Sequence, residues 1–238
     1  MEYQEPSEKN NPFFSIPQRK IDDAIEDIKN VHLNRSTGAL SPIGSVLVDA
    51  IHRYAEANIP VDYWFLDMGD FKGDAVLKRK YDELVSDLPQ AYKDGIRMCF
   101  AGSHGVGKSM VCASILKKAV EKRYSALYVN MVDVISISIC HDSEKKEAAR
   151  KILLASDFLV VDEFDQRFIG TDNAADLFGR ILEPTLRARI QNRMPIFLCT
   201  NSPNVATAFK GPLEASIGSL MKMVKVVPVV GQDYRGGV

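Results

Sequence analysis

Residues 102–109 have the types and spacing most suited to chemistry, reading Gly-Ser-His-Gly-Val-Gly-Lys-Ser. They fit G-x-x-x-x-G-K-[ST], the phosphate-binding P-loop. Glycines let the N–H groups of the loop turn inward toward phosphate oxygens, helped by the start of the following helix. Lys108 would reach the β- and γ-phosphates, and the Ser109 hydroxyl would bind Mg²⁺. We predict that the nucleotide is bound by Gly102, Ser103, His104, Gly105, Val106, Gly107, Lys108, Ser109 and Met110.

The elements around this loop are those that a P-loop needs. An apolar run over 96–100 predicts a strand before it, and residues 110–118 predict a helix after it. This context argues against a chance glycine turn.

A second apolar run, 158–161, ends in Asp162 and Glu163. A buried parallel strand delivers such carboxylates to its carboxyl end, where open α/β sheets bind ligands. We expect Asp162 to hold Mg²⁺ through water, and Glu163 to polarise the attacking water as a general base. The next strand, 195–199, leads into Asn201, which could hold that water or the γ-phosphate; a turn role in Thr-Asn-Ser-Pro is compatible with this. The predicted catalytic residues are Glu163, Asn201 and Lys108.

Five predicted strands alternate with helices, which implies a three-layer α/β/α P-loop fold with a five-stranded parallel sheet. We divide the chain into a mobile arm (1–18), a helical region (19–60) and an ATPase domain (61–238). The helical region is either a partner-binding module or packing for the core. Its second helix should bury Val46, Leu47, Ala50, Ile51 and Tyr54. The apolar residues of the arm either attach it to the body or form a docking peptide; they are Phe13, Phe14 and Ile16.

Composition limits the partners and the compartment. The 238 residues carry a net charge of −1, so DNA contact would need a local basic patch. No apolar run approaches the roughly 18 residues of a membrane span, and the N-terminus lacks a signal-peptide pattern. Four scattered cysteines are typical of buried thiols in a reducing compartment. We expect a cytoplasmic protein without a membrane partner.

The order of these parts resembles the AAA+ ATPases, and among them the helicase-loader family of DnaC, DnaI and IstB. The resemblance covers about residues 55–238. The P-loop and the acidic strand are common to many ATPases, whereas the lead-in and the tail are more specific. The matching segments are Ala57–Pro60, 95–109, 156–163, 177–189, 195–201 and 231–235.

This resemblance implies an ATP- and Mg²⁺-dependent ATPase that loads a replicative helicase, hexameric and DnaB-like, onto single-stranded DNA. It also implies a homo-oligomer as a further assembly. A helix over about 133–150 would help to line the DNA path with Lys145 and Lys146, although the neighbouring acids Asp142, Glu144 and Glu147 fit a solvated face equally well.

Three other functions use the same core. An IstB-like helper would bind a DNA transposase instead of a helicase. A small-molecule kinase would need a lid and an acceptor site, and neither is evident. An ATP-binding switch would hardly hydrolyse ATP, so that Glu163→Gln would leave turnover unchanged.

The sequence departs from the family at one segment. There the family has Leu-Gly-x-Arg, whose arginine acts on the ATP of a neighbouring subunit, and this chain has Ile217-Gly218-Ser219-Leu220. Leu220 stands in the place of the arginine. The charge is then absent or comes from Lys210, Lys222, Arg187, Arg189 or a partner.

We therefore expect weak ATP hydrolysis by the purified chain alone, because an arginine finger can be worth about 10³–10⁵ in rate. Phosphate release measured with and without the partner would check this. Rapid turnover by the chain alone would contradict it.

Overall fold

The structure is a computed structural model that describes residues 11–34, 36–69, 71–165, 172–202, 205 and 214–233. Side chains at 172–181 and 214–217 are outside this description. Five strands form one sheet in the order β2-β3-β4-β1-β5, and every neighbouring pair is parallel. The strands are β1 (Arg97–Ala101), β2 (Ala126–Asn130), β3 (Phe158–Asp162), β4 (Ile196–Thr200) and β5 (Lys225–Pro228). The predicted parallel sheet is confirmed.

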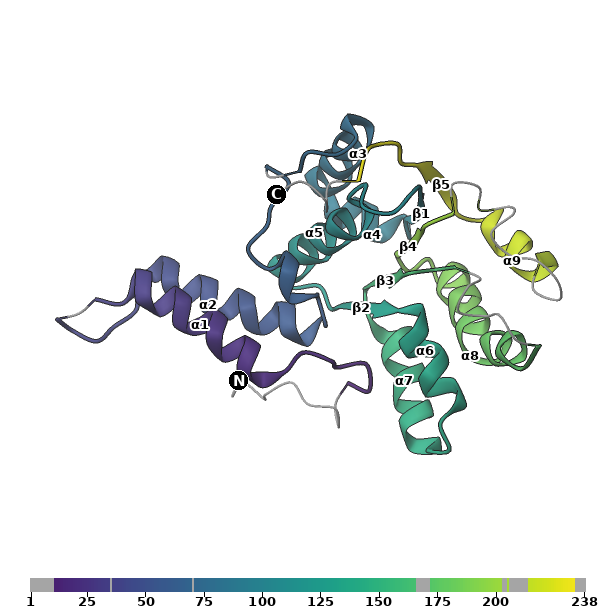
Figure 1. Cartoon of the computed structure of the whole chain (residues 1–238), viewed down its shortest axis with the longest axis horizontal. Coiled ribbons are helices and arrows are strands. Elements are labelled where there is room, and N and C mark those ends of the chain that lie inside the picture. The colour runs from purple at the N-terminus through teal and green to yellow at the C-terminus, as the bar shows by residue number, and fades with distance from the viewer. Residues whose placement is uncertain are drawn as a thin grey trace.

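Helices cover both faces of this sheet, giving the three predicted layers (Figure 1). One face packs α5 (Lys108–Glu121), with α3 (Ala75–Ser86) and α4 (Leu88–Lys93) beside it. The other face packs α6 (Met131–Ile139), α7 (Ser143–Ala155) and α8 (Asp172–Gln191). Helix α9 (Glu214–Met221) precedes β5 at the sheet edge. A short 3-10 turn, η1 (Val61–Tyr63), lies against α5.

The apolar spacing over 74–92 predicts a single helix, and this is wrong in one respect: the structure has two helices there, α3 and α4. The backbone leaves the helical region at Asp87, where φ is −135° and ψ is 64°. The Asp87 carboxylate then accepts a hydrogen bond from Gln90 N at 3.1 Å, and Pro89 occupies the first turn. A capping aspartate followed by proline starts a new helix better than it continues an old one.

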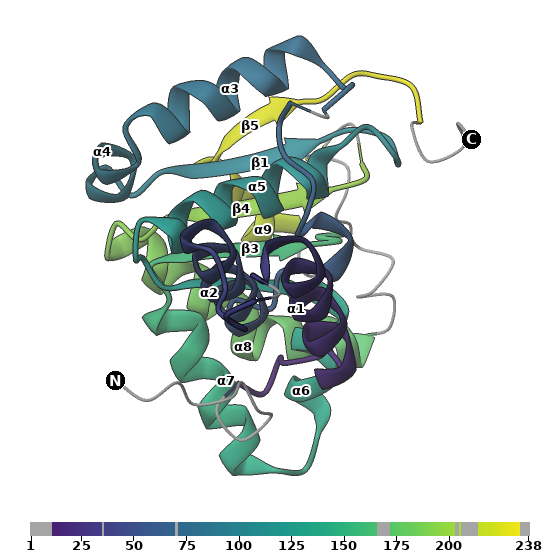
Figure 2. The same ribbon diagram turned by 90° about the vertical axis from the view of Figure 1, so that its left-hand side faces the viewer.

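The helical region forms a hairpin of α1 (Gln18–His32) and α2 (Pro42–Glu56) that projects from the body (Figures 1 and 2). Ile51 and Tyr54 are buried as predicted. The prediction that Val46 and Leu47 are buried is wrong, because both side chains are exposed. They lie on the part of α2 that projects past the core (Figure 1). The hairpin therefore packs on the core at one end and presents apolar side chains at the other.

Residues 11–17 belong to the predicted mobile arm, but they pack against the body of the protein. Phe13 and Ile16 are buried, and Asn58 Oδ1 accepts a hydrogen bond from Ser15 N at 3.1 Å. Phe13 and Ile16 thus attach residues 11–17 to the body. Residues 1–10 lie outside the described part of the chain.

Arg189 is the largest fully buried side chain and ties three segments together. Its guanidinium donates to the carbonyls of Leu153, Ser156, Asp157 and Pro195 at 2.7–3.2 Å. Burial lowers its pKa to about 10, so it stays charged near neutral pH. These bonds join α8 to the end of α7 and to the segment before β4, so Arg189 has a structural role.

Three of the four cysteines are buried free thiols, and Cys140 is partly exposed. None of the described helices is both long enough and apolar enough to cross a membrane.

Candidate nucleotide site

The carboxyl ends of β1, β3 and β4 bring the predicted motifs to one edge of the sheet. Ala101 at the end of β1 pairs with Thr200 at the end of β4, and β3 lies on the other side of β4. The P-loop therefore emerges next to Asn201, and the acidic pair emerges one strand further along. A hydrogen bond joins the two nearer motifs: Lys108 Nζ donates to Asn201 Oδ1 at 3.0 Å.

Lys108 is buried and held by oxygen atoms. Besides Asn201, its ammonium donates to the carbonyls of Gly102 at 3.0 Å and Ser103 at 2.6 Å. A triphosphate in the loop would offer oxygen acceptors to the same ammonium. The ammonium therefore lies inside the loop that the motif predicts to bind phosphate.

The loop geometry requires glycine at two positions. Gly105 has φ +74° and Gly107 has φ +92°, a region that side chains with a Cβ avoid. A Cβ at Gly107 would also collide with the Phe71 ring, and one at Gly105 with the Asp233 carboxylate. Phe71 and Asp233 therefore lie against the loop from two sides. Asp233 belongs to the tail segment 231–235, whose last two residues lie outside the described part of the chain.

The acidic pair presents its two carboxylates differently. Asp162 is buried, and its Oδ1 accepts a hydrogen bond from Glu163 N at 2.7 Å. Its Oδ2 accepts from the hydroxyl of Tyr128 on β2. Glu163 is exposed and has φ +52°, an uncommon conformation for a residue other than glycine. Such backbone strain is often found at functional sites.

A second tyrosine reaches the same place from outside the sheet. Tyr63 is the last residue of η1, and its side chain is hydrogen-bonded to that of Ser109. Its segment is anchored to α5 by Lys117, whose ammonium donates to the carbonyls of Tyr63 and Trp64 at 2.9 Å each and to that of Leu66. Burial first and Asp162 second raise the pKa of Tyr63 to about 12. Burial, then Asp162, raises the pKa of Tyr128 well above its usual value.

The donor set fits a nucleotide with Mg²⁺. Ser109 and Asp162 offer a hydroxyl and a carboxylate, and Mg²⁺ prefers such oxygen ligands. The positive φ angles of Gly105 and Gly107 give the loop the backbone freedom to turn its N–H groups toward phosphate oxygens. Of the other loop residues predicted to bind, Val106 is buried, Met110 is half-buried at the start of α5, and Ser103 and His104 are exposed.

The structure places the predicted DNA residues elsewhere. Lys145 and Lys146 are half-buried in the first turns of α7, on the opposite face of the sheet from α5. Sequence reasoning missed Tyr128 at the site. A tyrosine inside an apolar strand gives no signal that distinguishes it from ordinary core.

The candidate replacements for the missing arginine also differ in placement. Leu220 is buried, so this position packs the core. Arg189 cannot reach a neighbouring subunit, because it is fully buried among four carbonyls. Arg187 is half-buried and its Nε donates to Glu183 at 2.7 Å, whereas Lys222 is exposed. Lys210 lies outside the described residues.

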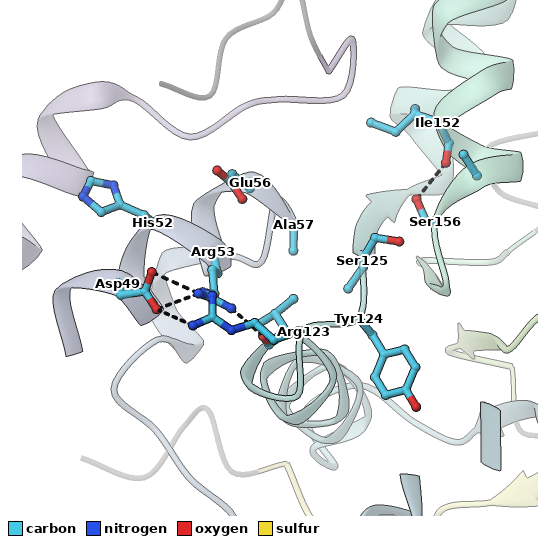
Figure 3. A pocket seen from close by; sticks show the side chains of 13 residues that line it. Asp49, His52, Arg53, Glu56, Ala57, Arg123, Tyr124, Ser125, Ile152 and Ser156 are labelled. Atoms are coloured by element: carbon cyan, nitrogen blue, oxygen red, sulfur yellow. Dashed lines mark hydrogen bonds and ion pairs between the residues drawn. The ribbon is translucent and has the colours of Figure 1, made fainter. Parts of the chain in front are cut away.

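A groove of about 860 Å³ lies at the other end of the sheet. Figure 3 shows it between Arg53 and Glu56 of α2, Arg123 after α5, and Ile152 of α7. Ser125 and Ser156, which precede β2 and β3, also line it. The groove therefore faces the amino ends of these strands and is not the phosphate site.

No family model matches the sequence, and no curated protein matches it either. Solved structures do resemble it. A protein from Streptococcus pyogenes serotype M3, described there as a proposed primosome component, is 15% identical with a TM-score of 0.57, over 75% of this chain and 93% of that one. DnaI is 17% identical with a TM-score of 0.55, over 72% of this chain and 88% of that one.

DnaA from Aquifex aeolicus, solved with the ATP analogue AMPPCP, is 16% identical with a TM-score of 0.53, over 72% of this chain and 51% of that one. At these identities the likeness establishes the fold. The chain therefore shares the three-layer α/β/α fold of these proteins, as predicted.

Replacing Lys108 with alanine is expected to weaken ATP binding about tenfold or more, because hydrogen bonds to charged groups contribute about 1.5–3 kcal/mol. Titration with a fluorescent ATP analogue would measure this. The matched control is Lys118→Ala on the same helix, whose exposed ammonium pairs with Glu121 at 2.7 Å. Equal binding by both variants would contradict a phosphate role for Lys108.

Proposed function

We propose that this chain is an ATPase that loads a replicative helicase onto single-stranded DNA. The observation that supports the ATPase part is the meeting of Lys108, Asp162 and Asn201 at the carboxyl edge of a parallel sheet. The fold it shares with DnaI and with a proposed primosome component supports the assignment to replication.

In this proposal the P-loop residues bind the phosphates, with Lys108 turned from its carbonyl acceptors to phosphate oxygens. Ser109 and Asp162 would hold Mg²⁺, which neutralises charge on the phosphates when it is bound. Glu163 is exposed beside Asp162, so its carboxylate is free to face solvent and to take a proton from an attacking water. Asn201 would orient that water or the outer phosphate from the neighbouring strand.

The partner surface proposed for the helicase is the hairpin tip, which we define as Val31, Leu33, Ile43, Val46 and Leu47. Val31, Ile43 and Val46 are 77%, 65% and 67% exposed, although apolar. They lie where α1 ends and α2 begins, at the end of the hairpin that projects from the body (Figure 1). A cluster of exposed apolar residues on one projecting element is typical of a protein-binding surface.

Val46→Asp is expected to weaken capture of the purified hexameric helicase about tenfold or more, because a charge would enter an apolar interface. Binding isotherms with immobilised helicase would measure it. Val76→Asp on α3 is the matched control, since Val76 is also an exposed helical valine but lies away from the hairpin. Undiminished capture by Val46→Asp would reject this surface. Binding of a DNA transposase in place of the helicase would favour the IstB-like alternative.

The proposed DNA contact is Lys145 and Lys146 of α7. Their helix also carries Glu144 and Glu147, and Asp142 caps it by accepting a hydrogen bond from Lys145 N at 2.9 Å. Replacing both lysines with alanine should lower the slope of log K against log[salt] for single-stranded DNA by about 1.4, since each phosphate contact contributes about 0.7. Lys118→Ala with Lys122→Ala, in the last turn and at the cap of α5, is the control. An unchanged slope would show that these lysines do not contact the DNA and belong to a solvated helix face.

A further inference from the structure

We propose that Tyr63 and Tyr128 are positioning residues that hold Ser109 and Asp162 in place for Mg²⁺. This inference rests on the proposed nucleotide site and adds two residues to it. Each of the two expected metal-binding side chains is hydrogen-bonded to the side chain of one tyrosine, and the two tyrosines come from different parts of the chain.

Tyr128 fixes the carboxylate of Asp162. It lies on β2, where its Cα pairs with Val160, and its side chain is buried. Its hydroxyl donates to Oδ2 of Asp162, while Glu163 N donates to Oδ1 at 2.7 Å. One donor on each oxygen sets the plane of the carboxylate. A carboxylate has about four acceptor sites, so both oxygens keep lone pairs for a hydrated cation.

Tyr63 contacts Ser109 from a segment outside the sheet. It is half-buried, and its side chain is hydrogen-bonded to the Ser109 side chain. Hydrogen bonds fix the backbone on both sides of the Tyr63 side chain. Lys117 Nζ donates to the carbonyls of Tyr63 and Trp64, and Trp64 Nε1 donates to Ile59 O at 2.8 Å. A segment before the sheet thus reaches the first turn of α5 and orients a hydroxyl there.

Packing alone does not account for these hydroxyls. Phenylalanine would fill the same space at Tyr128 without the cost of burying a polar group. The Tyr128 hydroxyl instead donates a hydrogen bond to Asp162, the buried carboxylate of the acidic pair. Groups that orient metal ligands from behind are typically worth about 10–100-fold in metal affinity.

The test separates metal-dependent from metal-independent nucleotide binding. Affinity for a fluorescent ATP analogue is measured over a range of Mg²⁺ concentrations and in EDTA, for wild type, Tyr128→Phe and Tyr63→Phe. We expect the Mg²⁺ concentration that gives half of the maximal gain in ATP-analogue affinity to rise about tenfold or more in both variants. Affinity in EDTA should stay at the wild-type value, because the P-loop is unchanged.

The matched control is Tyr92→Phe. Tyr92 also donates to an aspartate, Asp157 Oδ1 at 2.9 Å, but at the amino end of β3. It should leave the Mg²⁺ dependence unaltered.

Wild-type Mg²⁺ dependence in Tyr128→Phe and Tyr63→Phe would overturn the inference, and so would an equal loss of affinity in EDTA, which would indicate general damage. If Tyr128→Phe does not fold, Tyr63→Phe decides, since Tyr63 lies outside the sheet. Wild-type protein that binds no nucleotide would instead reject the proposed function itself.

Discussion

The parallel pairing of β1, β4 and β3 is the constraint on which the site depends. It places three strand ends side by side, and the pairing continues past the strands into the functional loops. Gly102 N donates to Thr200 O at 3.3 Å, and Phe164 N donates to Cys199 O at 2.7 Å. The P-loop and the segment after the acidic pair are therefore both tied to β4. A slip of one residue in either pairing would reverse which side chains face the site.

The same core joins the projecting hairpin to the P-loop helix. Arg53 Nη1 donates to Val120 O at 3.2 Å, and the Tyr54 hydroxyl donates to Glu121 Oε1 at 3.0 Å. Both acceptors are in the last turn of α5, whose first turn begins with Lys108. One helix therefore connects the base of the hairpin with the phosphate loop. This is a continuous packed route between the two surfaces to which we assign binding, and it gives a physical path for coupling them.

The sequence predicts the sheet and its motifs, because each strand and each motif is specified by residues that are close together in the chain. The P-loop and the strand before Asp162 are each defined by a short stretch of sequence. The break at Asp87 was missed because helical periodicity continues across it. Val46 and Leu47 were misplaced because periodicity identifies an apolar face but not the distance at which the body ends. Tyr63 and Tyr128 converge from residues 65 apart, which no window in the sequence can reveal.

The burial of Lys108 bears on how such a site would bind its ligand. The ammonium is held away from water by three oxygen acceptors, so the fold already contains a largely desolvated cation. Moving it to phosphate oxygens would exchange one set of acceptors for another, and little water would have to be removed at that step. Asn201 would lose Lys108 as its donor in the same exchange. Its amide would then be free to turn toward the outer phosphate, so that occupancy of the P-loop and the orientation of Asn201 are linked through a single hydrogen bond.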